Sequence, residues 1–79
     1  MKLGTVTGKV AMKKRTEGLK QAEVLLVEME GNSVAALDRA GAVPGDRVLV
    51  VMSHAAGRYS MEAPSDAVVV AVVEYLAVW

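Results

Sequence analysis

The chain has 79 residues, enough for one domain, and its lack of cysteine excludes a disulfide framework and a thiolate metal site. Hydrophobic residues make up 53% of the sequence but aromatic residues only 4%, so the apolar mass is mostly aliphatic. Nine basic and nine acidic side chains give no net charge, which argues against a nucleic-acid-binding protein, because contacts with phosphate need a basic excess.

The opening segment, residues 3–12, alternates as a strand does, with Gly4, Val6 and Gly8 on one face. Two glycines in one strand are typical of a bulge, a sharp barrel bend or a neighbour packed against the backbone. The polar residues 13–18 predict a loop.

Residues 20–29 predict a second strand, followed by a turn at 30–33. The next segment, 33–38, has two interpretations. Ser33 could cap a helix that ends before Gly41, or the segment could return as a hairpin strand. The hairpin is favoured because glycine and asparagine separate two apolar runs.

A second turn is predicted at 41–46, where Pro44 followed by Gly45 suits a type II turn. The strands predicted at 47–52 and 67–78 are apolar on both faces, which indicates a central or interface position. The whole chain therefore reads as an all-β single domain, 1–79, with about five short strands in a small closed barrel and at most one short helix. Closure would remove exposed edges.

A monomer of this size buries only about 60% of the surface of its unfolded chain, so the aliphatic excess favours an oligomer. The first residues lack the apolar core of a signal peptide, and the apolar run 67–73 is too short to span a bilayer. We therefore expect a cytoplasmic protein with no membrane partner.

Four segments share a pattern with a known family: LGTVTGKV at 3–10, EGLK and LLV at 17–20 and 25–27, LDRAGA and GDRVLV at 37–42 and 45–50, and APSDAVVVAVV at 63–73. In this order they resemble the bacterial microcompartment vertex proteins (EutN/CcmL-like) of carboxysomes and ethanolamine-utilisation compartments. The resemblance covers nearly the whole chain.

The resemblance implies an oligonucleotide-binding-like (OB-like) five-stranded barrel that assembles into cyclic homopentamers. In such a shell the pentamers cap the vertices, where hexameric shell proteins cannot close a polyhedron. It further implies no enzymatic activity, no cofactor and no metal, a location in the microcompartment shell, and as partners only other copies of the chain and the hexameric shell proteins, not nucleic acid.

Two departures from the family pattern mark candidate positions. Val43 replaces the second glycine of a Gly-Ala-Gly turn, and the loop beginning at Ser53 is one residue longer than usual. The candidate ring-interface or pore-edge residues are Gly41, Ala42, Val43, Ser53, His54, Ala55 and Arg58. For Arg58, an intersubunit contact and an exposed position remain alternatives.

His54 is the only histidine, and the sequence offers it no credible catalytic or metal-binding partners. It is interpreted as a loop residue, with a pH-responsive ring of five histidines as an alternative. The acidic residues Asp38, Asp46 and Asp66 each sit beside a turn or strand start, where carboxylates accept backbone N–H bonds.

Other functions fit the sequence less well than that of a shell protein. A nucleic-acid module would stack bases on aromatics in a basic groove, whereas the basic run 13–15 is followed closely by Glu17. A generic interaction barrel would be a monomer. The terminal aromatics, Tyr75 and Trp79, could dock on a partner or close the end of the barrel.

Overall fold

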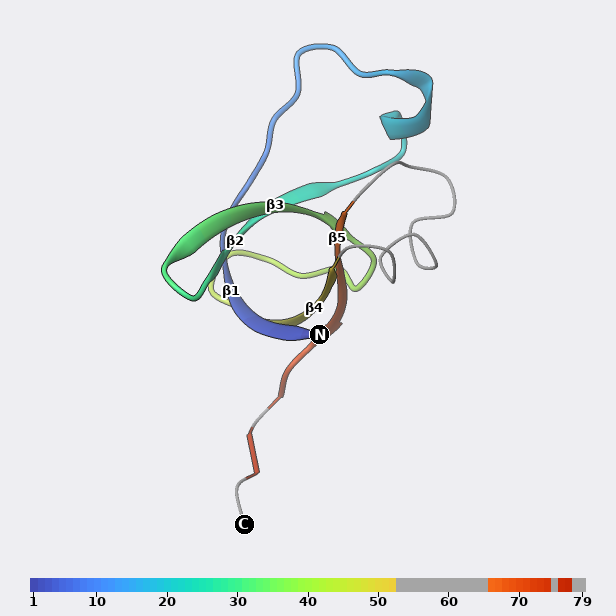
Figure 1. Ribbon diagram of the computed structural model, residues 1–79. Coiled ribbons are helices and arrows are strands. Elements are labelled where there is room, and N and C mark those ends of the chain that lie inside the picture. The colour runs from blue at the N-terminus through green and yellow to red at the C-terminus, as the bar shows by residue number, and fades with distance from the viewer. Residues whose placement is uncertain (53–65, 75, 78–79) are drawn as a thin grey trace.

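The structure is a computed structural model that describes residues 1–52, 66–74 and 76–77. Its elements are β1 (Lys2–Lys9), a 3-10 turn η1 (Glu17–Leu19), β2 (Val24–Met29), β3 (Asn32–Asp38), β4 (Arg47–Met52) and β5 (Ala67–Val72). The strands form one closed barrel in the order β1-β2-β3-β5-β4 (Figure 1). β3 and β5 pair in parallel, and the other neighbours pair antiparallel. The prediction of an all-β, five-stranded barrel is confirmed.

The barrel interior is filled by one side chain in two along most strands, because successive side chains point to opposite faces. The buried residues of this cluster are Val6, Leu25, Val27, Met29, Ala36, Ala42, Val48, Val50, Ala67 and Val69. Valine dominates because a β-branched side chain fits a pleated, half-buried surface.

A second apolar cluster lies outside the barrel wall. The register places Val24 opposite Leu37, Leu37 opposite Val68, and Val68 opposite Val51, so one row crosses four strands. Leu19 packs on this row from the loop that joins β1 to β2. The two-sided apolar character of β4 and β5 was predicted to mark a central or interface position, and at this end of the strands the chain covers the outer face itself.

Arg15 holds that loop in place. Its Nη1 donates to the backbone carbonyls of Leu19, Lys20 and Ala22, at 3.3, 3.1 and 3.0 Å. The prediction of a strand from residue 20 was wrong, because residues 17–22 form the turn that covers the outer cluster and β2 starts at Val24.

The two glycines of β1 serve different purposes. A β-carbon at Gly4 would lie 2.5 Å from Val27 Cγ1, so this position needs the close approach that only glycine permits. The register between β1 and β2 shifts between Val6 and Gly8, and nothing lies within 4 Å of a β-carbon at Gly8. Two of the structures expected for glycine in a strand, a close neighbour and a bulge, are therefore both present.

The hairpin interpretation of residues 33–38 is confirmed, with the turn one residue earlier than predicted. Glu30 and Gly31 have φ of 51° and 82°, and β3 begins at Asn32. Two successive positive φ values give the turn whose twist matches a two-stranded ribbon.

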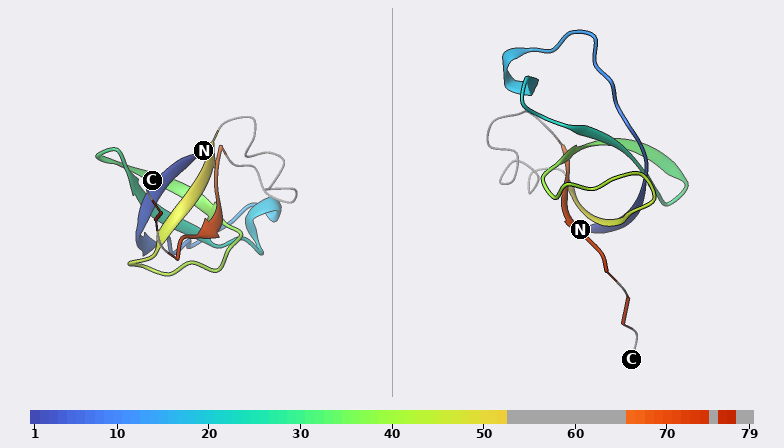
Figure 2. Two further views of the ribbon diagram at one scale, coloured as in Figure 1. Left: turned by 90° about the horizontal axis from the view of Figure 1, so that it is seen from below. Right: turned by 180° about the vertical axis from the view of Figure 1, so that it is seen from behind.

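The last strand is shorter than predicted. β5 ends at Val72, and one more backbone bond, from Val73 N to Arg47 O at 2.7 Å, follows it. The chain then runs away from the barrel, as Figure 1 and the right-hand view of Figure 2 show. The predicted strand over 67–78 was wrong for residues 73, 74, 76 and 77, because β-forming side chains alone do not supply a pairing partner, and residues 75 and 78 lie outside the described residues.

Candidate functional site

The segment between β3 and β4 carries three of the candidate residues and is held by two aspartates. Asp38 Oδ1 accepts N–H bonds from Ala40, Gly41 and Ala42, at 3.0, 3.0 and 3.3 Å. Gly41 adopts a φ of 75°, which lets successive N–H groups converge on one oxygen. Asp38 therefore acts as the internal anchor of this loop, as was expected of a turn carboxylate.

Asp46 closes the other end of the loop. Its Oδ2 accepts from Val43 N at 2.9 Å, and its own N–H donates to Val43 O at 3.0 Å. With Pro44 next and Gly45 at a φ of 98°, the turn has the predicted type II features. Backbone bonds from Gly45 N to Val6 O and from Val6 N to Asp46 O tie the loop to β1.

The three candidate residues on this anchored loop differ in how far they are exposed to solvent. Ala42 is 1% exposed and packs in the barrel core, whereas Gly41 lies at the surface and Val43 is 50% exposed. The loop thus presents the side chain of Val43 on a backbone that is hydrogen-bonded at both ends. The remaining candidates, Ser53, His54, Ala55 and Arg58, lie outside the described residues.

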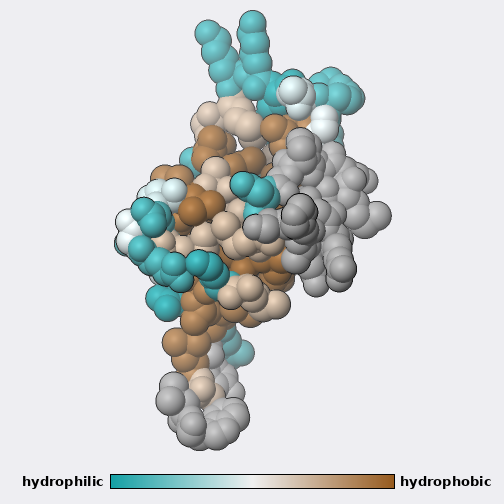
Figure 3. All heavy atoms as spheres, viewed as in Figure 1, coloured by the Kyte–Doolittle hydropathy of each residue, from teal (hydrophilic) through white to brown (hydrophobic). Residues whose placement is uncertain are grey.

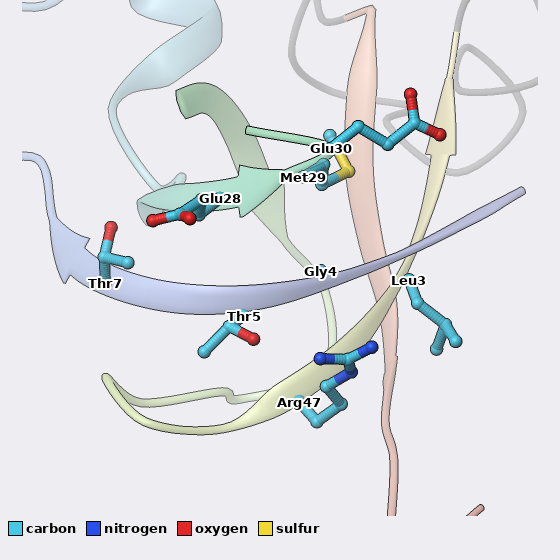
Figure 4. Close-up of a pocket in the computed structure, with 8 residues that line it drawn as sticks. All are labelled: Leu3, Gly4, Thr5, Thr7, Glu28, Met29, Glu30 and Arg47. Carbon is cyan, nitrogen blue, oxygen red and sulfur yellow. The ribbon is translucent and has the colours of Figure 1, made fainter. Parts of the chain in front are cut away.

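An open hollow of about 360 Å³ runs along the outer face of β1 (Figure 4). It is lined by Leu3, Gly4, Thr5, Thr7, Glu28, Met29, Glu30 and Arg47. The acidic side chains come from β2 and its turn on one side of β1, and Arg47 comes from β4 on the other. Sequence reasoning missed this hollow; the only signal was the alternation that turns Thr5 and Thr7 outward.

The polar and charged side chains that line this hollow suit a contact surface. One ion pair crosses its end, from Lys2 Nζ to Glu30 Oε2 at 3.1 Å. Within the described parts of the chain, no three histidine, cysteine or acidic residues come together as a metal site would require. The same part of the chain also contains no helix that is both long and apolar enough to cross a membrane.

The basic run at 13–15 is partly engaged in the fold. Arg15 holds backbone carbonyls, and Lys20 beyond it pairs with Glu17 at 2.9 Å. The other two residues of the run, Lys13 and Lys14, are both exposed. Arg15 therefore serves to hold the loop between β1 and β2.

Apolar side chains are also exposed on the barrel wall and the tail. Leu3 and Leu26 are each 37% exposed, on strands β1 and β2, and Val72 and Leu76 are 43% and 58% exposed at the end of β5 and beyond it. Figure 3 shows the apolar surface continuing from the barrel onto the tail. A contiguous apolar patch on the surface of a small protein is typical of a contact site.

Comparison with known proteins gives a consistent result. The family model described as ethanolamine utilisation protein EutN/carboxysome matches residues 1–74. A comparison with curated proteins found no match.

Several solved structures share the fold over nearly the whole chain. The ethanolamine utilisation protein EutN from Escherichia coli is 32% identical, with a TM-score of 0.86, over 99% of this chain and 90% of that one. The GrpN pentameric microcompartment shell protein from Rhodospirillum rubrum is 28% identical, with a TM-score of 0.84, over 100% of both chains. CcmL from Nostoc sp. PCC 7120 is 28% identical, with a TM-score of 0.82, over 96% of this chain and 92% of that one.

Proposed function

Because this chain belongs to the EutN/CcmL family of bacterial microcompartment shell proteins, we infer that it is a structural subunit of such a shell and forms cyclic pentamers. The observation that carries this conclusion is the match to the pentameric shell protein GrpN, which covers 100% of both chains with a TM-score of 0.84. Family members are structural proteins rather than enzymes, so the subunit's function is assembly in the cytoplasmic shell.

A ring places specific demands on the surface of each subunit. Its interfaces are heterologous, so every copy must present two different, complementary surfaces that close by rotation. The exposed apolar side chains of Leu3 and Leu26 lie on different strands, and Val43 adds a third position on the anchored loop. Burial of apolar area at about 25 cal/mol per Å² would add several kcal/mol to a fold that is small on its own.

We further propose which position the pentamer occupies in the shell and which residues form its contacts. Residues 1–79 act as one domain, and the pentamer occupies the vertices, where it meets hexameric shell proteins. Gly41 and Val43 with Ser53, His54, Ala55 and Arg58 contribute to the ring contact or the edge of the central pore. The bonded loop around Val43 supports this, because a contact surface gains when its backbone is ordered before binding.

Native mass spectrometry of the purified chain tests the proposed function. The subunit mass is 8.3 kDa, so a pentamer has a mass of 41.5 kDa, five times 8.3. A dominant species at that mass supports the ring, and recruitment into particles on co-expression with a hexameric shell protein supports the vertex position. A protein that stays at 8.3 kDa at every concentration would overturn the proposal.

A further inference from the structure

The outer wall of the barrel stays apolar beyond the row that the chain covers for itself. That covered row includes Val51 on β4 and Val24 on β2. Two residues along β4 from Val51 lies Leu49, and two residues along β2 from Val24 lies Leu26. Both point outward, because the residues on either side of them in the strand fill the barrel core.

One outward-facing apolar row crosses three strands. Leu3 of β1 lies opposite Leu49 of β4, and Leu49 lies opposite Ala71 of β5. Leu3 is 37% exposed, and the other two residues are half-buried. Arg47, two residues before Leu49 on the same face of β4, is exposed. We call these four residues the β4 face, an apolar row with a cation beside it.

A second outward-facing apolar pair lies on the other two strands. Leu26 of β2 lies opposite Ala35 of β3, and both are exposed. Glu28, two residues after Leu26 on the same face of β2, is exposed as well. We call these three residues the β2 face, an apolar pair with an anion beside it.

The two faces lie on different sides of the barrel. The strands close in the order β1-β2-β3-β5-β4, so β1, β4 and β5 are contiguous and carry the β4 face, whereas β2 and β3 carry the β2 face. Because the barrel is closed, surfaces on these two sets of strands point in different directions. A subunit of a ring needs this arrangement, since it contacts one neighbour on each side.

The charges of the two faces are complementary. Glu28 and Arg47 come from strands on opposite sides of β1 (Figure 4). Among the described residues the ion pairs are Lys2 with Glu30 and Lys20 with Glu17, so neither Arg47 nor Glu28 is neutralised by them.

This distribution of charge favours contact between unlike faces. Two β4 faces in contact would bring Arg47 against Arg47, and two β2 faces would bring Glu28 against Glu28, which like-charge repulsion opposes. A β4 face against a β2 face pairs the opposite charges instead. That contact is heterologous, which is the kind that closes a ring by rotation.

We propose that the β4 face of each subunit packs against the β2 face of the next subunit in the ring, and that Arg47 of one copy pairs with Glu28 of its neighbour. This inference rests on the proposed pentamer and names the surfaces that form it. Burial of Leu3 and Leu49 against Leu26 removes apolar area from water, and the charge pair fixes which faces meet.

Charge reversal with subunit mixing tests the contact. Arg47→Glu gives a subunit with an anion on both faces, and Glu28→Arg gives one with a cation on both. Each variant alone should show a dissociation concentration raised about tenfold or more, because every interface then opposes like charges. Co-expression of the two variants should yield mixed pentamers that dissociate at lower concentration than either variant alone, counted by native mass spectrometry. The recovery is partial, since a ring with an odd number of subunits keeps one contact between like charges.

Mixing separates this contact from a charge pair within one subunit. If Arg47 and Glu28 acted only inside their own chain, each variant would keep its own defect and mixing would bring no recovery. Lys14→Glu and Glu23→Arg are the matched controls, because they make the same charge changes at exposed positions outside both faces. Each control should assemble like the wild type, and far-ultraviolet circular dichroism verifies that every variant is folded.

Cross-linking tests the same contact without any change of charge. The protein has no cysteine, so Leu26→Cys and Leu49→Cys each introduce a single thiol. A short bifunctional thiol reagent should give covalent dimers in pentamers that contain both variants, and monomer alone in pentamers of either variant by itself. Replacing Leu49→Cys with Ala11→Cys, at an exposed loop position, is the control and should give no dimer.

Failures of the two proposals are distinguishable. A wild-type chain that never exceeds the monomer mass overturns the proposed function. A pentameric wild type whose folded charge-reversal variants assemble as well as the controls, or gain nothing from mixing, overturns the contact between the two faces and leaves the pentamer standing. Absence of covalent dimers in the mixed Leu26→Cys and Leu49→Cys pentamers leads to the same conclusion.

Discussion

Gly4 and Val27 approach so closely across the β1–β2 pair that a β-carbon on Gly4 would lie 2.5 Å from Val27 Cγ1. Met29 Cγ lies at 2.7 Å from the same point, so the interior side chains fill the space that the glycine leaves free. This contact is one reason why a wall of β-branched residues can close around so narrow a core.

Gly4→Ala should therefore destabilise the barrel. The added methyl group forces side chains of the interior out of their packing, at a cost of about 1–3 kcal/mol. Chemical denaturation followed by far-ultraviolet circular dichroism measures the change. Gly8→Ala is the matched control, because nothing lies within 4 Å of its new β-carbon. Equal stability of the two variants would contradict the packing argument.

Asp38→Ala should loosen the loop between β3 and β4. It leaves the N–H groups of Ala40, Gly41 and Ala42 without their shared acceptor, which we expect to cost about 1–2 kcal/mol of unfolding free energy. Asp38→Asn retains an acceptor oxygen and should recover most of that loss. Amide hydrogen exchange at residues 40–42 gives the local readout, and protection in Asp38→Ala equal to that of the wild type would show that this side chain does not hold the loop.

Val43→Ser should weaken the ring and spare the fold. The side chain is 50% exposed, so the barrel's unfolding free energy should change by less than about 0.5 kcal/mol. If Val43 contributes to the ring contact, the dissociation concentration of the pentamer should rise severalfold in sedimentation experiments. Val10→Ser, at a valine that is 36% exposed, serves as the comparison. A ring as stable as the wild type would remove Val43 from the interface.

Arg15→Ala should expose the outer cluster. Three backbone carbonyls lose their donor, and the turn that carries Leu19 is no longer held over the row formed by Leu37 and Val68. We expect faster hydrogen exchange at residues 19–24 and a loss of about 1–2 kcal/mol. Arg15→Lys keeps the charge but not the planar fork, so its effect should lie between those of alanine and the wild type. An unchanged exchange rate in the alanine variant would rule out this role.

Much of the barrel could be predicted from local pattern. The alternation around Val6, the glycine between two apolar runs and the Pro44-Gly45 pair each act over a few residues, so they are readable without the rest of the chain. The role of Asp38 and Asp46 in holding the loop could also be predicted, because an aspartate beside a turn has backbone N–H groups nearby in any fold.

The predictions were wrong where the structure of a segment depends on another strand or on a cluster elsewhere in the chain. Residues 73–78 have strong β-forming character, yet β5 ends at Val72, since pairing depends on which strand lies alongside. Residues 20–23 resemble the start of a strand, but the chain uses them to cover an apolar row that exists only once four strands are in register.

The sequence by itself determined the strand count, the turns, the family and hence the class of function, because these depend on side-chain alternation and on short motifs. The tertiary structure alone decided which apolar faces the chain covers for itself and, among the described strands, which part of β3 pairs with β5. Those features depend on register and strand order, which are set by pairing between segments far apart along the chain.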